Sequence, residues 1–168
     1  MIPHIDVSIE SQEWEALEAP TEFVEKVIET AVEDCGRQLT EKTEISIVLC
    51  SDSFIEDLNR KWRGIAQPTN VLSFPMGGDP TTQPLLGDIV IAYGTAQHEA
   101  AAAGKPLRDH VAHLLVHGFL HLIGHDHQEI AEAEAMEALE GTILGHLGIA
   151  DPYAAPSLKE TVGAHERA

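Results

Sequence analysis

Hydrophobic and polar positions follow two different periods along this chain. Segments in which apolar residues alternate with polar ones or run together predict buried β-strands, and they span residues 4–10, 44–50, 70–74 and 88–92. Segments in which apolar residues recur every three or four positions predict amphipathic helices, and they span residues 20–36, 51–62, 94–103 and 128–147.

A further apolar segment, residues 110–127 (HVAHLLVHGFLHLIGHDH), contains six of the ten histidines. At about 100° per residue, His110, His113, His117 and His121 fall on one narrow stripe of a helix. Apolar residues cover nearly all the rest of its surface, and a helix of that kind is buried. We therefore expect a central helix whose polar stripe faces a cleft or a ligand.

Four strands and about five helices in mixed order predict a fold of the α+β (mixed α/β) class. We expect a single four-stranded sheet, with the helices packed around the central His-bearing helix. The chain shows no internal repeat and no linker, so residues 1–153 are expected to form one domain. Residues 154–168 are polar with little periodicity, which predicts a flexible C-terminal tail.

The histidine spacing predicts a metal site. His117 and His121 are four residues apart and share one helix face, as in the H-E-x-x-H motif of zincins. Gly124 can adopt a positive φ and end the helix, so that His127, just past the turn, can return to the same ion. The metzincin motif has this H-x3-H-x2-G-x2-H spacing.

One position departs from the protease motif. The Glu that serves as general base in those proteases is replaced by Gly118. A zinc metalloprotease-like hydrolase is therefore an alternative that Gly118 disfavours. A purely structural zinc is a weaker option, because such sites usually have four protein ligands, often Cys, and neither Cys35 nor Cys50 lies near the motif.

Charge and composition limit the possible partners. The net charge is −18, from 28 acidic and 10 basic residues, which taken alone argues against nucleic acid. The densest basic cluster is Arg60, Lys61 and Arg63. Two cysteines without metal spacing fit a reducing cytosol. No apolar run is long enough to span a bilayer and the N-terminus lacks signal-peptide features, so we expect a cytoplasmic protein without membrane partners.

Several stretches together resemble the YbeY family of metal-dependent endoribonucleases, the bacterial rRNA maturation factors. They are HGFLHLIGHDH, LNRKWRGIAQPTNVLSFP, LLGDIVIA and MEALEGTILGHLGIADPY, and the resemblance runs from about Ser46 to Tyr153. It implies a bacterial cytoplasmic protein of ribosome biogenesis that cleaves single-stranded RNA. The associated processes are 16S rRNA 3′-end maturation and ribosome quality control.

The resemblance also implies one zinc ion per chain, bound by His117, His121 and His127, and an arginine that matches Arg63. Three neutral imidazoles leave a fourth zinc position for water, which zinc activates at neutral pH. The guanidinium group suits phosphate. We therefore expect hydrolysis of an RNA phosphodiester by metal-activated water, with Arg63, His117 and His121 as the catalytic residues.

Three more residues are candidates for orienting the ligands. His125 stands where the family usually has Tyr, and it is a rival ligand, but His127 holds the tenth position after His117 that the Gly turn requires. Asp126 is a candidate general base or a partner of a ligand imidazole. His113, one turn before His117, either supports the ligands or lines the cleft.

RNA is the partner that this hypothesis requires. The non-enzymatic alternative is a zinc-containing ribosome assembly factor that docks on small ribosomal subunit proteins or on a ribosome-assembly GTPase. The acidity of the chain is compatible with this alternative, because an acidic surface can bind basic ribosomal proteins.

Overall fold

The computed structural model describes residues 3–39, 42–79, 84–125 and 128–153. Over these ranges four strands form one sheet in the order β1-β2-β4-β3, with bounds β1 His4–Ile9, β2 Glu44–Cys50, β3 Val71–Pro75 and β4 Leu85–Ala92. Strands β1, β2 and β4 are parallel, whereas β3 runs antiparallel to β4 and forms one edge.

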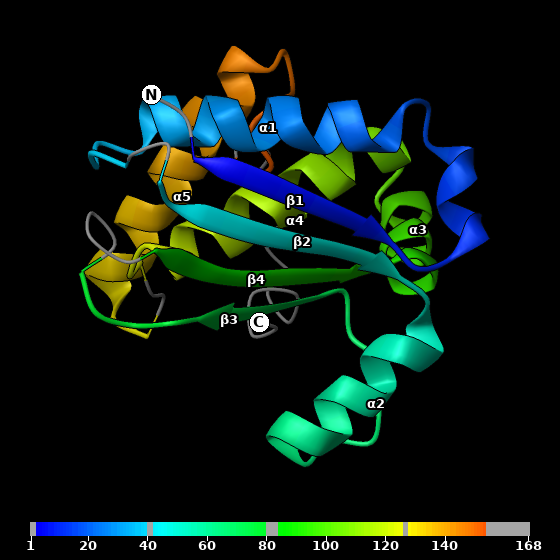
Figure 1. The fold of residues 1–168 in the computed structure, drawn as a ribbon. Helices are drawn as coiled ribbons and strands as arrows, with labels where there is room; N and C mark the ends of the chain where they lie inside the picture. Colours follow the sequence, from blue (N-terminus) through cyan, green and yellow to red (C-terminus); the bar gives the residue numbers. More distant parts are fainter. Residues whose placement is uncertain (1–2, 40–41, 80–83, 126–127, 154–168) are drawn as a thin grey trace.

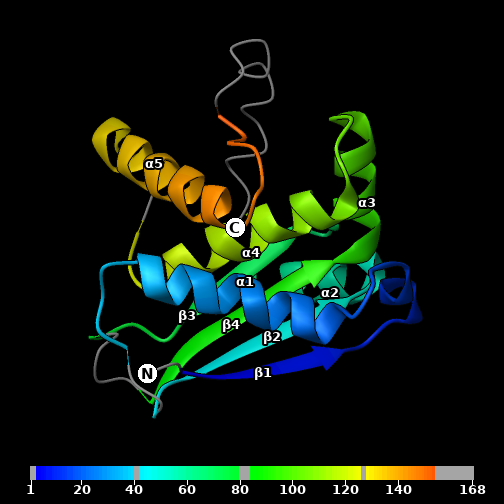
Figure 2. The ribbon, with the colours of Figure 1, turned by 90° about the horizontal axis from the view of Figure 1, so that it is seen from above.

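Five α-helices accompany the sheet in the described part of the chain: α1 Pro20–Asp34, α2 Asp52–Arg63, α3 Tyr93–Ala102, α4 Leu107–Leu122 and α5 Ile130–His146. The predicted mixed α+β class with one four-stranded sheet is therefore confirmed. A short 3-10 helix, η1 Gln12–Ala16, was not predicted. Helices α1, α3, α4 and α5 lie on one side of the sheet and α2 lies on the other (Figures 1 and 2).

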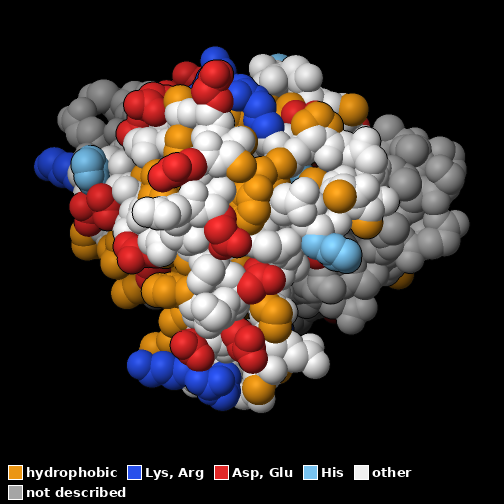
Figure 3. Space-filling model, turned by 90° about the vertical axis from the view of Figure 1, so that its right-hand side faces the viewer, with side chains coloured by type: hydrophobic (Ala, Val, Ile, Leu, Met, Phe, Trp, Pro, Cys, Tyr) orange, Lys and Arg blue, Asp and Glu red, His pale blue; other side chains and the backbone are white. Residues whose placement is uncertain are grey.

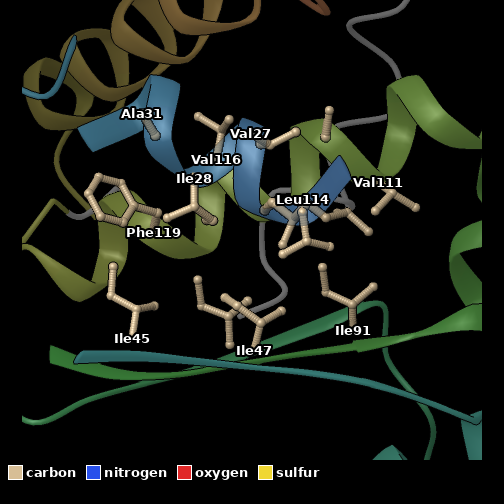
Figure 4. Close-up of a cluster of buried hydrophobic side chains, with 14 of the residues drawn as sticks. Val27, Ile28, Ala31, Ile45, Ile47, Ile91, Val111, Leu114, Val116 and Phe119 are labelled. Atoms are coloured by element: carbon tan, nitrogen blue, oxygen red, sulfur yellow. The ribbon is translucent and has the colours of Figure 1, made fainter. Parts of the chain in front are cut away.

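Helix α4 lies at the centre of the main hydrophobic core, as its apolar surface predicts. Its side chains pack between α1 and the sheet, where Val111 and Phe119 face Ile45 and Ile91 of the strands (Figure 4). Eleven of its sixteen residues are buried. Burial at this scale holds α4 rigidly against the strands, so the histidines that it carries have fixed positions.

Helix α2 covers a smaller core on the opposite face of the sheet. Ile55 is fully buried against Leu72 and Val90 there, and Ser51 caps the helix by accepting a hydrogen bond from the Phe54 N–H. The apolar spacing of residues 51–62 predicts that Phe54 also points inward, and this prediction is wrong, because its side chain is 41% exposed. Phe54 lies about 100° around the helix from Ile55, beyond the narrow stripe that meets the sheet.

Two further expectations concern the C-terminal tail and membrane-spanning segments. The predicted tail, residues 154–168, lies outside the described residues, so the single-domain boundary at residue 153 stays a prediction. None of the described helices combines the length and the hydropathy that a membrane-spanning segment needs.

Candidate functional site

The C-terminus of α4 forms the turn that the histidine spacing predicts. The helix ends at Leu122, and Gly124 has a φ of 103°. The Gly124 N–H donates to the carbonyl of His121 at 3.1 Å, and the His125 N–H donates to the carbonyl of Leu120 at 2.9 Å. This pair of bonds is the Schellman motif that ends helices at a left-handed glycine, and it turns the backbone of His125 back toward His121.

His117 and His121 face one another across one turn of α4. Their Nε2 atoms are 3.2 Å apart. The Nδ1 atom of His121 lies 3.0 Å from the carbonyl oxygen of His125, and that of His117 lies 2.6 Å from Oε2 of Glu140. Because carbonyl and carboxylate oxygens only accept hydrogen bonds, both imidazoles carry a proton on Nδ1. In the neutral rings the two Nε2 lone pairs therefore point toward the same small region.

This arrangement fits a bound zinc ion. Two nitrogen lone pairs at 3.2 Å repel each other unless a proton or a cation lies between them. Two nitrogens bound tetrahedrally to zinc, each at about 2.0–2.1 Å, are separated by about 3.3 Å. The spacing and the tautomers of His117 and His121 thus match two ligands of one zinc ion.

Glu140 of α5 contacts His117 on the side of the ring opposite His121. Its carboxylate is buried and accepts three hydrogen bonds, from Nδ1 of His117, from Nε2 of His113 at 3.3 Å and from the Tyr153 hydroxyl at 2.5 Å. Burial alone would raise the pKa of Glu140, but the hydrogen bonds from His113 and His117 outweigh it and hold that pKa well below its usual range. Glu140 is therefore a buried negative charge directly behind a predicted metal ligand.

His113 is connected to His117 through this carboxylate. Burial lowers the pKa of His113, so its imidazole is neutral near pH 7. Its Nε2 atom also lies 3.1 Å from the hydroxyl of Tyr153, whose pKa is raised by burial and by the nearby Glu140 charge. The sequence left two roles open for His113, supporting the ligands or lining the cleft. Its contact with Glu140 favours the supporting role.

The first histidine of the stripe belongs to a separate polar cluster. His110 Nε2 lies 2.8 Å from Oε1 of Glu99, which also accepts a hydrogen bond from the buried Asn70 side chain at 3.0 Å. These contacts join α4, α3 and the start of β3. His110 thus binds a protein carboxylate at the other end of α4 from the predicted metal site.

Gly118 faces the sheet. A Cβ at this position would lie 2.9 Å from Cγ2 of Ile89 and 3.0 Å from Oγ of Ser73. The position occupied by a catalytic Glu in metalloproteases is therefore closed by β4 and β3, and the absent side chain lets α4 approach the strands.

Arg63 lies at the end of α2, on the other side of the sheet from α4 (Figure 1). Its guanidinium group is exposed and forms no ion pair with any residue in the described ranges. The predicted role of Arg63 on the phosphate stays a prediction.

The third predicted ligand, His127, and its neighbour Asp126 lie outside the described residues. Within the described residues no group of three or more His, Cys, Asp or Glu side chains is placed to hold a metal ion. His125 contributes its backbone carbonyl to His121, and burial, with the Arg37 charge as a smaller cause, lowers the pKa of its imidazole. The choice of His127 over His125 as a ligand stays a prediction.

Glu140 is the residue that sequence reasoning missed. Glu140 is one of several glutamates of α5, and the others lie on the more exposed faces of the helix. One signal was available: Glu140 is four residues after Met136 and three before Ile143, on the apolar face of α5. A carboxylate within an apolar stripe requires hydrogen-bonding partners, and here two of the partners are histidines of α4.

Comparisons with known proteins find relatives over most of the chain. The family model described as "Endoribonuclease YbeY" matches residues 8–148. A protein named "Endoribonuclease YbeY" from Methylocella silvestris is 58% identical over 156 residues, which cover 93% of this chain and 89% of that protein. One of the same name from Beijerinckia indica is 50% identical, with 91% of this chain and 78% of the relative covered.

One solved structure is similar in fold. The solution structure of TM1509 from Thermotoga maritima matches with a TM-score of 0.53 and 22% identity, over 90% of this chain and 99% of that protein. At this identity the similarity supports the arrangement of helices and strands alone.

Proposed function

Because the chain belongs to the YbeY family of endoribonucleases, we propose that it hydrolyses phosphodiester bonds of single-stranded RNA at one zinc ion bound by His117, His121 and His127. Endoribonucleases are hydrolases that act on RNA, so the reaction class follows from the family. The zinc ion and its three histidine ligands are the part of the proposal that goes beyond the family assignment.

The paired imidazoles carry this proposal. Both Nδ1 atoms donate to oxygens, which orients the Nε2 atoms of His117 and His121 toward each other at 3.2 Å. Imidazole nitrogens with fixed tautomers and partners behind them are typical of metal ligands. Three neutral histidines, rather than four protein ligands, suit a catalytic zinc site with one open position.

The residues of the chain have separate roles in this proposal. Zinc at such a site supplies a Lewis acid for a phosphoryl oxygen and activates water at neutral pH. Glu140 fixes the proton of His117 on Nδ1. Arg63, exposed and without an ion-pair partner among the described residues, binds a phosphate of the substrate through its planar donor group.

Peptide hydrolysis is disfavoured by the surroundings of Gly118. A protease of the zincin type requires a Glu next to the first histidine, and β4 closes that position here. The biological setting that we propose is the one implied by the family resemblance, namely 16S rRNA 3′-end maturation and ribosome quality control in the bacterial cytoplasm, with ribosomal proteins as further partners.

Cleavage of defined RNAs by the purified, zinc-loaded protein tests this function. We expect the wild-type protein to cut single-stranded RNA. His121→Ala should lose both bound zinc and cleavage. Arg63→Glu should retain its zinc and lose cleavage by about 100-fold or more, since it replaces a cation that binds a phosphate of the substrate with an anion that repels it.

Lys26→Glu is the matched control for the charge reversal, because Lys26 is an exposed residue of α1. It should cleave RNA at the wild-type rate. Cleavage by His121→Ala protein that contains no zinc would overturn the metal-dependent mechanism, and peptide hydrolysis without RNA cleavage would overturn the function itself.

A further inference from the structure

Trp62 is a large apolar side chain left on the surface of α2. It is 63% exposed, whereas Trp14, the other tryptophan, is fully buried. The ring of Trp62 meets that of Phe74 edge to face, with centroids 6.3 Å apart, and Nζ of Lys61 lies 5.5 Å from its centroid. These contacts hold one edge of the indole while most of its surface remains in water, where exposure of so much apolar area is unfavourable.

Positive charge is concentrated beside this ring. Arg60, Lys61 and Arg63 are neighbours of Trp62 in the sequence and three of the ten basic residues in a chain of net charge −18. Arg60 forms an ion pair with Asp57 at 2.7 Å, but an exposed pair of this kind is weak in water and a phosphate can replace the carboxylate. Lys and Arg side chains gather at the lower end of the molecule in Figure 3, at the level where α2 lies in Figure 1. Basic residues in a last helical turn stabilise the helix dipole, but that effect gives no reason for an exposed indole among them.

An aromatic ring among cations suits one kind of ligand. Single-stranded nucleic acid presents phosphates to the cations and unpaired bases to the ring. Base pairing in a duplex would hide the flat faces of the bases. An exposed indole with Lys61 against its ring, in the densest basic segment of an acidic chain, is therefore complementary to a single strand.

The edge strand β3 connects this ring with the predicted metal site. Successive side chains of a strand point to opposite faces of the sheet. Ser73 lies against α4, with its Oγ 3.5 Å from the carbonyl oxygen of Gly118, directly after His117. The next residue, Phe74, packs against Trp62 on the other face. A strand of RNA that passes around the β3 edge can therefore contact both sides.

We propose that Trp62 is a stacking platform for an unpaired base of the RNA substrate, with Arg60 and Lys61 contacting the adjacent phosphates. This inference rests on the proposed function and adds to it a binding site outside the metal centre. The platform selects single-stranded RNA, because a base must be unpaired to stack on the indole. Bases of every kind can stack there, so the site does not specify a sequence.

The two tryptophans allow a direct binding test. Full-length His121→Ala protein, which should leave RNA uncut, is titrated with a 12-nucleotide oligouridylate and with the same strand in a duplex. We expect the single strand to quench the fluorescence of Trp62 and the duplex to do so far less. Trp62→Ala in the same background should lose this quenching and bind the single strand roughly 5- to 100-fold more weakly. Trp62→Phe, which retains a ring, should lose less affinity.

Two controls separate stacking from general effects. Phe54→Ala removes another exposed aromatic ring, 41% exposed against 63% for Trp62, from the other end of α2 and should bind RNA as the parent protein does. Arg60→Ala and Lys61→Ala should each lower the slope of log affinity against log salt by about 0.7, the value for one phosphate contact of a single strand.

Cleavage by the wild-type and Trp62→Ala proteins is measured in parallel. If wild type cleaves RNA and Trp62→Ala binds it unchanged, the platform is overturned while the proposed function stands, and the surface is left to a protein partner. If wild type does not cleave but the oligonucleotide quenches Trp62 and binding falls in Trp62→Ala, the proposed function fails and the RNA platform is supported.

Discussion

Nδ1 of His117 lies 2.6 Å from Oε2 of Glu140, a contact that joins α4 to α5 across 23 residues of sequence. The carboxylate fixes the imidazole tautomer and makes the opposite nitrogen a stronger donor to a metal. The same carboxylate also accepts from His113 and Tyr153, so one buried charge orients a ligand and connects it to the C-terminal segment of the described chain.

Glu140→Gln should lower zinc affinity by about 10- to 100-fold, the usual effect of removing the partner of a ligand imidazole. Glutamine retains the size of the side chain but not its charge, so the protein should remain folded. The measurement is zinc competition with a chelator at pH 7, combined with circular dichroism. Glu134→Gln, at an exposed position of the same helix, should bind zinc as wild type does. Equal affinities in both variants would show that Glu140 does not support the site.

Substitution of His125 and His127 should affect zinc binding unequally. Nδ1 of His121 donates to the backbone carbonyl of His125. His125→Ala retains this carbonyl, so the variant should bind zinc nearly as tightly as wild type. His127→Ala should lose zinc to the same extent as His117→Ala, because it removes the third proposed ligand. Cobalt substitution checks the ligand set by optical spectroscopy. Loss of zinc from His125→Ala alone would make His125 the ligand.

Hydrophobic periodicity was enough to predict the mixed α+β fold class and the buried position of α4, because a helix that is apolar on nearly all sides is stable only in the protein interior. The turn at Gly124 also followed from sequence, since the motif requires a left-handed residue there. Glu140 did not follow, because its acidic neighbours on α5 concealed the one carboxylate on the apolar face. The position of Arg63 across the sheet from α4 did not follow either, since periodicity carries no information on which face of a sheet a helix covers.

Gly118→Ala should destabilise the protein by about 1–3 kcal/mol, the usual cost of overpacking. The added methyl group would lie 2.9 Å from Ile89 and 3.0 Å from Ser73, so α4 or the strands must shift. Gly145→Ala on α5 is the control, because a Cβ there meets no atom within 4 Å. It should stabilise the protein by about 0.4–1 kcal/mol. Urea denaturation measures both values, and a neutral Gly118→Ala would contradict the close packing of α4.

The free energy of unfolding should fall in mildly alkaline solution because the thiol of Cys50 is buried. Burial, with Asp52 and two glutamates as smaller causes, raises the pKa of its thiol to about 12, whereas an unfolded cysteine has a pKa of about 8.5. Because the folded protein retains a proton that the unfolded chain loses, this contribution is complete below about pH 8.5 and is lost as the pH rises toward 12. Between these values it declines by about 1.4 kcal/mol per pH unit. Cys50→Ala has no thiol at this position and should show a correspondingly smaller slope in urea denaturation between pH 7.5 and 10.5. Parallel stability curves for the two proteins would contradict a buried, protonated Cys50.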